Sequence, residues 1–214
     1  MLKPDLAGGC GFGSYLSNIS RSLRQNASMS NQSVLRTGVK MIERVSKLSA
    51  AAMASADFSF TVFERALPPF YEEGLGKITT IPAYEKTYVR DDDLYVEPND
   101  TCRMIATASV KGEAVGYVAV SRSWNGCAQI DEIMISRPHR GEGIGRALMD
   151  EAVLWAKENN LSIMRLETQD TNVAACRFYE RYGFKLGGFD RHLYDAVDTD
   201  QRAETALFWY LHLG

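Results

Sequence analysis

The residues Arg140-Gly141-Glu142-Gly143-Ile144-Gly145 connect a strand signal to a helix signal. The preceding run, 130–135, is apolar enough for a buried strand, and apolar residues recur at helical spacing over 143–159. A glycine-rich turn at the start of a helix presents unpaired backbone N–H groups and the positive end of the helix dipole. The segment therefore predicts an anion site, to which Arg140 and Arg146 add positive charge.

Three classes of phosphate-binding turn are similar to this segment. A P-loop needs G-x-x-x-x-G-K-[ST], and no Lys-Ser or Lys-Thr pair follows these glycines. A dinucleotide-binding turn needs G-x-G-x-x-G, and Arg146 stands where its third glycine belongs, although Glu167 imitates its ribose-binding acid. The third class has the spacing [R/Q]-x-x-G-x-G, which Arg140, Gly143 and Gly145 match.

A second motif follows downstream. Residues 172–184 have the spacing N-x-x-A-x-x-x-Y-x-x-x-G-F, with Asn172 at its start and Tyr179 within it. Alone, this spacing also fits an N-capped helix with an aromatic core face. In this order, the two motifs resemble the two signatures of the GNAT acyltransferases. On that resemblance, residues 55–214 are identified as a member of the GNAT superfamily.

Strand and helix signals elsewhere agree with that fold. Before the glycine turn, β-rich runs occur at 58–63, 103–110, 114–121 and 128–136, with an irregular region from Pro68 to the acidic residues at 91–93. After it, the patterns predict a helix at 143–159, a strand at 161–168, a helix at 172–182, and strands at 184–194 and 206–213. This order predicts an α/β (α+β) domain with a mixed sheet. The resemblance implies the GNAT fold, in which a mixed, mostly antiparallel central sheet has helices on both faces.

Residues 1–54 have a different composition from the rest. Seven basic and two acidic residues precede Asp57, and serine is frequent. Apolar residues at helical spacing from Val34 to Leu48 predict one basic amphipathic helix, or else the segment is a poorly ordered extension. An organelle-targeting segment and a helix on an anionic membrane surface also fit. The resemblance does not cover this extension, so we expect the GNAT domain to occupy residues 55–214.

The composition limits the classes of partner. Net charge is −3 over 214 residues, and the basic extension leaves the remaining body more acidic than that total. An acidic body is poorly suited to nucleic acid and suits a cationic partner. No apolar stretch approaches the roughly 20 residues that span a bilayer. The scattered cysteines and histidines show no metal-ligand spacing. We expect a cytoplasmic protein without a metal, although the extension leaves organelle targeting open.

The resemblance also implies the residues of an active site that uses acetyl-CoA as co-substrate. Tyr179 would donate a proton to the departing thiolate. A carboxylate would accept the proton of the amine. Glu132 and Glu167 are the two main candidates, between which the sequence does not choose, and Asp131 is a weaker third choice. The residues expected to hold acetyl-CoA lie on the strand before the turn, in the turn and at the second motif: Ile133, Met134, Ile135, Arg140, Gly141, Gly143, Ile144, Gly145, Arg146 and Asn172.

Within the superfamily, several segments look like those of streptothricin (nourseothricin) acetyltransferases. They include Ser123-Trp124-Asn125, residues 165–169 and residues 206–210. The acidic cluster Asp91-Asp92-Asp93 would attract a cationic small-molecule amine, such as the β-lysine side chain of streptothricin. Two alternatives stay open: a protein or peptide N-acetyltransferase, and a CoA-binding module without catalysis. The resemblance is also compatible with a homodimer.

Overall fold

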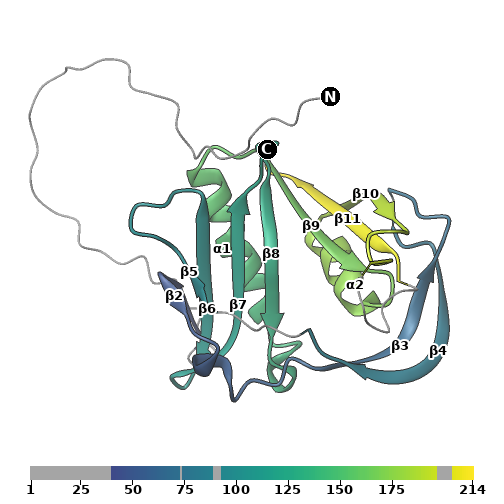
Figure 1. The fold of residues 1–214 in the computed structure, drawn as a ribbon, viewed down its shortest axis with the longest axis horizontal. Helices are drawn as coiled ribbons and strands as arrows, with labels where there is room; N and C mark the ends of the chain where they lie inside the picture. The colour runs from purple at the N-terminus through teal and green to yellow at the C-terminus, as the bar shows by residue number, and fades with distance from the viewer. Residues whose placement is uncertain (1–39, 73, 89–92, 197–203) are drawn as a thin grey trace, which may run out of the picture. The chain divides into compact units, whose positions relative to one another are not determined.

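The computed structural model describes residues 40–72, 74–88, 93–196 and 204–214. Its largest sheet has seven strands in the order β1-β6-β7-β8-β9-β11-β10 (Figure 1). In that order the strands are β1 (Lys40–Val45), β6 (Arg103–Val110), β7 (Glu113–Arg122), β8 (Ala128–Ile135), β9 (Ile163–Gln169), β11 (Ala206–His212) and β10 (Lys185–Asp190). Every neighbouring pair is antiparallel except β8 and β9, so the sheet is mixed and mostly antiparallel, as predicted.

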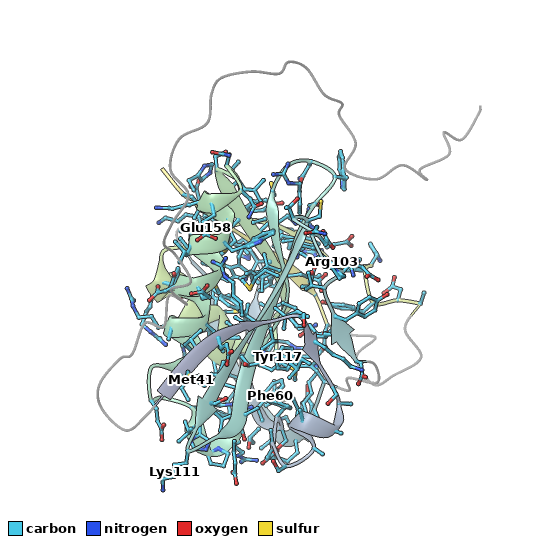
Figure 2. The ribbon with its side chains drawn as sticks, turned by 90° about the vertical axis from the view of Figure 1, so that its left-hand side faces the viewer. Met41, Phe60, Arg103, Lys111, Tyr117 and Glu158 are labelled. Atoms are coloured by element: carbon cyan, nitrogen blue, oxygen red, sulfur yellow. The ribbon has the colours of Figure 1, made fainter. Side chains whose placement is uncertain are left out.

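Two α-helices pack on the sheet. Helix α1 (Ile144–Glu158) connects β8 to β9, and α2 (Val173–Tyr182) connects β9 to β10. Figure 2 shows α1, with Glu158 labelled, beside the strands that carry Met41 and Tyr117. The apolar faces of both helices join the sheet in one hydrophobic cluster, as their helical spacing predicts. This cluster fixes where each helix begins relative to the strand before it.

A second, smaller cluster contains Tyr117, which is completely buried on β7. It is covered by short elements: β2 (Lys47–Leu48), the 3₁₀ helix η1 (Ala51–Met53) and β5 (Leu94–Tyr95), which pairs with β2. Leu48 and Met53 are buried against Tyr117, and Phe58 meets the Tyr117 ring edge-on at 6.0 Å. The chain between β1 and β3 therefore forms part of the folded domain.

The prediction of a helix between Val34 and Leu48 is wrong for residues 40–48, the part that the structure describes. Residues 40–45 form β1, which pairs with β6 along its full length, so the sheet begins before residue 55. One basic side chain of this stretch has partners in the domain: Arg44 donates to Glu151 at 2.6 Å and to Glu158 at 2.7 Å, both on α1. Backbone pairing with β6 overrides the helical spacing of the apolar residues. Residues 1–39 lie outside the described ranges.

The irregular region predicted after Pro68 also contains an unpredicted strand. Strand β4 (Lys77–Lys86) pairs antiparallel with β3 (Phe60–Leu67) in a separate two-stranded sheet. Pro82 lies opposite a register shift in β3, where the missing N–H of proline removes no ladder hydrogen bond. At the end of β4, the buried Lys86 ammonium donates to both carboxylate oxygens of Glu204, at 2.8 and 2.7 Å. This ion pair attaches β4 to the segment that precedes β11.

The other predicted elements agree with the structure more closely. The bounds of β6, β7, β8, β9, β11 and both helices differ from the predicted ones by two residues at most. The strand predicted at 184–194 ends at Asp190, and a turn follows it. Over the described ranges, none of the helices combines the length and apolar composition needed to cross a membrane.

Candidate active site

The glycine turn between β8 and α1 adopts a conformation that favours glycine. Gly141 has φ 79° and Gly143 has φ 84°, in the left-handed region that costs an L side chain about 1–2 kcal/mol. A Cβ at either position would meet no other heavy atom within 4 Å. Gly143 is the N-cap of α1 and supplies no side-chain cap to its first N–H groups. Uncapped amides beside open space fit the predicted anion site.

The next two residues of the turn fix it to the domain. Ile144 is 2% exposed and packs in the core, so its side chain anchors the start of α1. A Cβ at Gly145 would lie 3.4 Å from Ile135 Cδ1 and 3.7 Å from Phe178 Cζ. These are ordinary van der Waals distances, so the start of α1 packs in contact with both β8 and α2.

The two arginines of the turn have different surroundings. The Arg140 guanidinium donates to three backbone carbonyls, those of Ile135 at 3.0 Å, Ser59 at 2.8 Å and Phe58 at 3.0 Å. Arg140 thus ties the end of β8 to the segment before β3, while its predicted contact with phosphate stays a prediction. Arg146 is exposed, with its guanidinium 5.5 Å from the centroid of the Tyr182 ring, and it supplies the cation at the turn.

Strands β8 and β9 diverge beside the turn (Figure 1). They pair only at Ala128 with Met164 and at Gln129 with Arg165. Beyond these pairs, residues 133–135 pair with β7 alone among the described strands. The edge of Ile133, Met134 and Ile135 that faces β9 therefore has backbone groups without a strand partner in the described ranges. An extended ligand with amide groups can pair with such an edge, as predicted for the pantetheine arm.

The two candidate carboxylates lie on these diverging strands. Glu132 on β8 accepts a hydrogen bond from the buried Tyr117 hydroxyl. Glu167 on β9 accepts one from the Tyr194 hydroxyl. Each carboxylate thus accepts a hydrogen bond from one tyrosine. These contacts alone do not show which of the two glutamates is the general base. Both assignments stay predictions at this point.

Tyr179 on α2 is buried in an aromatic cluster. Its ring centroid lies 5.5 Å from that of Phe178, 5.9 Å from Phe184 and 6.3 Å from Trp209. No residue in the described ranges hydrogen-bonds its hydroxyl, and burial raises its pKa, so the phenol is protonated at neutral pH. Burial likewise raises the pKa of the nearby Cys176 thiol, which makes it a poor nucleophile and fits its role in helix packing.

The remaining predicted residues have contacts within the protein. Asn172 caps α2, because its Oδ1 accepts from Ala175 N at 3.3 Å. Asp93 accepts from Ala50 N at 2.9 Å and forms an ion pair with Lys47 at 2.9 Å. Asp93 therefore holds the segment between β1 and β3, while its predicted contact with the acceptor stays a prediction. Asp91 and Asp92 lie outside the described ranges.

Three side chains near the site were given no role from the sequence. Tyr88, Gln169 and Tyr194 form hydrogen bonds that connect Asn172 with Glu167. Tyr88 is more than 80 positions from Gln169 and Asn172 in the chain. No local pattern could have indicated these contacts, because they depend on how β4, β9 and the turn after β10 come together.

Comparison with known proteins decides the family. The model of the acetyltransferase (GNAT) family matches residues 64–184, which is more than half of the chain. The chain belongs to the acetyltransferase (GNAT) family. This match confirms the superfamily and the fold that the two sequence motifs predicted.

Relatives and solved structures resemble this GNAT domain along nearly their whole length. Streptothricin acetyltransferase A of Bacillus subtilis (strain 168) is 34% identical over 176 residues, which are 79% of this chain and 98% of that protein. A Bacillus anthracis str. Ames protein assigned as a streptothricin acetyltransferase, solved in complex with acetyl coenzyme A, has a TM-score of 0.68 at 31% identity, covering 81% of this chain and 99% of that one. Nourseothricin acetyltransferase has a TM-score of 0.64 at 28% identity, with coverage of 82% and 99%.

Proposed function

We propose that this protein transfers the acetyl group of acetyl-CoA to a primary amine of streptothricin. The observation that carries the proposal is the extent of the similarity, which spans 98% of a streptothricin acetyltransferase. A match confined to the glycine turn and the second motif would support acetyl-CoA binding alone. A match over the whole relative also includes the segments that surround the acceptor, so it supports the same class of acceptor.

The described residues fit acetyl-CoA. The amides at the start of α1, next to Gly141 and Gly143, would hold the diphosphate, because phosphate oxygens need close approach to the backbone. Arg146 adds a cation at the same end of the helix. The unpaired edge of residues 133–135 would hold the pantetheine arm. The predicted cofactor-binding residues at these positions stay predictions, and Arg140 among them donates to three backbone carbonyls.

The steps of acetyl transfer follow from where protons and negative charge must move during the reaction. Acetyl-CoA supplies the acetyl group as a thioester, and the acceptor supplies an amine with a pKa of about 10.4, which arrives protonated. Glu132 or Glu167 accepts a proton from this amine, which frees its lone pair for attack. Backbone N–H groups of residues 133–135 stabilise the negative charge that develops on the carbonyl oxygen. Tyr179, which its raised pKa keeps protonated, donates its proton to the departing sulfur, so that CoA leaves as a thiol. The second proton lost by the attacking nitrogen restores the Tyr179 hydroxyl.

Initial rates of CoA release with a panel of amines test the proposal. The panel contains streptothricin, spermidine and a peptide with a free N-terminus. We expect kcat/KM for streptothricin to exceed the other values by about tenfold or more, because a site built for one acceptor discriminates by at least this much. A preference for the peptide would instead assign a peptide N-acetyltransferase. Binding of acetyl-CoA without CoA release from any amine would indicate a non-catalytic module.

A further inference from the structure

Four hydrogen bonds connect the cap of α2 to Glu167. The Asn172 amide nitrogen donates to the Tyr88 hydroxyl at 3.4 Å, and that hydroxyl donates to Gln169 Oε1. The Gln169 amide nitrogen donates to the Tyr194 hydroxyl at 3.0 Å, and that hydroxyl donates to Glu167 Oε1. We call this set of five residues the Glu167 chain. It joins the segment after β4, strand β9, the cap of α2 and the turn after β10.

The helix cap fixes the direction of every bond in the Glu167 chain. Asn172 Oδ1 accepts from Ala175 N, so the amide nitrogen is the group that faces Tyr88. Tyr88 then has its own proton free for Gln169, whose amide in turn presents its nitrogen to Tyr194. All four donors therefore point toward Glu167, and hydrogen bonds aligned in this way strengthen one another. A carboxylate is the acceptor that completes such a series.

Contacts outside the Glu167 chain also hold its two tyrosines, Tyr88 and Tyr194, in place. The Tyr88 ring lies 5.4 Å from the Phe60 ring, and the buried Lys86 ammonium lies 5.2 Å from its centroid. Burial raises the pKa of Tyr88, so its hydroxyl stays a donor. Tyr194 is 8% exposed, and its turn is closed by His192 N, which donates to Asp190 at 2.7 Å. Neither ring can leave its position without breaking several contacts.

Glu167 differs from the other members of the Glu167 chain because it is exposed. Tyr194 holds its Oε1, whereas its Oε2 has no hydrogen-bond partner in the described ranges. One oxygen is thus fixed by the protein and the other is open to a ligand. Glu132 lies on the neighbouring strand, where Tyr117, its hydrogen-bond donor, also contacts Met134 Sδ at 3.0 Å. Among the described residues, no series of hydrogen bonds connects Glu132 with the cap of α2.

We propose that Tyr194, Gln169 and Tyr88 are positioning residues that orient Glu167 toward the amine of the acceptor. This inference rests on the proposed function, and it selects Glu167 as the carboxylate that meets the amine. The side-chain amide of Gln169 is a poor carrier of protons at neutral pH, so the Glu167 chain sets geometry and does not conduct protons. The proton that Glu167 accepts leaves from its open oxygen, Oε2.

The first test is the variant Tyr194→Phe, which keeps the ring and removes the hydrogen bond to Glu167. We expect kcat/KM for the amine to fall about ten- to hundredfold, the usual effect of a lost hydrogen bond to a charged group. KM for acetyl-CoA should not change. Tyr88→Phe should act in the same direction. The control is Tyr71→Phe, because Tyr71 is an exposed tyrosine outside the Glu167 chain, and its rate should equal that of the wild type.

A double-mutant cycle separates positioning from a general structural role. A residue that acts only through Glu167 has no further effect once that carboxylate is gone. In a Glu167→Gln background, Tyr194→Phe should therefore leave the remaining rate unchanged. Equal losses in both backgrounds would overturn the proposal, and so would an unchanged rate for Tyr194→Phe alone. Thermal melting of each variant shows that the fold is intact.

The outcomes also separate this inference from the proposed acceptor. The cycle uses whichever amine of the panel reacts fastest. If that amine is not streptothricin but the cycle behaves as expected, the proposed acceptor fails and the role of the Glu167 chain stands. If streptothricin reacts and Tyr194→Phe has the wild-type rate, the inference fails and the proposed function stands. Absence of turnover with every amine contradicts both.

Discussion

Replacing Gly143 with alanine separates folding from ligand binding at the N-cap of α1. The free protein should tolerate the methyl group, since a Cβ there meets no other heavy atom within 4 Å. The backbone conformation, with φ 84°, should cost about 1–2 kcal/mol for an L residue. For a domain of this size, that is a decrease of about 2–8 °C in Tm. The fold itself should be unchanged.

Binding of acetyl-CoA should weaken much more than stability. The methyl group occupies the open space through which phosphate oxygens approach the amides of α1. Loss of one hydrogen bond to a charged group weakens binding by about ten- to hundredfold. Gly126→Ala is a matched control, because Gly126 has φ 81° and its Cβ also meets nothing within 4 Å. It lies in the turn between β7 and β8, at the opposite end of β8 from the glycine turn.

Calorimetric titration with acetyl-CoA, performed below the Tm of both variants, measures the two affinities. Gly126→Ala should lose a similar amount of stability and bind acetyl-CoA like the wild type. Gly143→Ala should lose both stability and affinity. If Gly143→Ala binds acetyl-CoA with wild-type affinity, the diphosphate does not lie against this turn, and the assignment of the anion site is refuted.

Three further results are expected. Tyr179→Phe should lower the single-turnover rate about 100-fold, a typical contribution of general acid catalysis, with unchanged acetyl-CoA affinity; a loss of affinity would contradict this. Glu167→Gln should reduce kcat more than Glu132→Gln, and the reverse order would assign the base to Glu132. Lys86→Met should lower the free energy of unfolding in urea by about 3–5 kcal/mol, because Glu204 then stays buried without the Lys86 counter-charge. Lys86→Met/Glu204→Leu should recover most of this loss. An unchanged urea midpoint for Lys86→Met would argue against this burial.

The sequence predicted well those elements whose signals lie in neighbouring residues. From β8 to α2, the glycines of the turn, the Asn172 cap and the apolar spacing of both helices are signals that neighbouring residues carry. Strand β1 was missed because its backbone partners lie on β6, and its Arg44 contacts α1 more than 100 positions away. Strand β4 was missed because Pro82 interrupts the strand signal of its sequence. In the structure, a register shift in β3 accommodates this proline.

The same distinction applies to the site. The motifs predict roles for the turn glycines and Tyr179, because spacing along one chain segment carries that information. The role of Arg140 was predicted from its charge, but its partners are carbonyls of Phe58 and Ser59, far away in the sequence. Tyr88 and Tyr194 could not be assigned for the same reason, since their hydrogen bonds exist only after separate elements pack together.

Backbone amide NMR spectra recorded during a titration with acetyl-CoA test most directly whether the glycine turn holds the co-substrate. The resonances of Gly141, Gly143 and Gly145 should shift together with those of residues 133–135. The resonances of Gly112 and Gly126, in other turns of the sheet, should stay in place. Shifts confined to other parts of the domain, with the turn glycines unmoved at saturation, would contradict the proposed binding site.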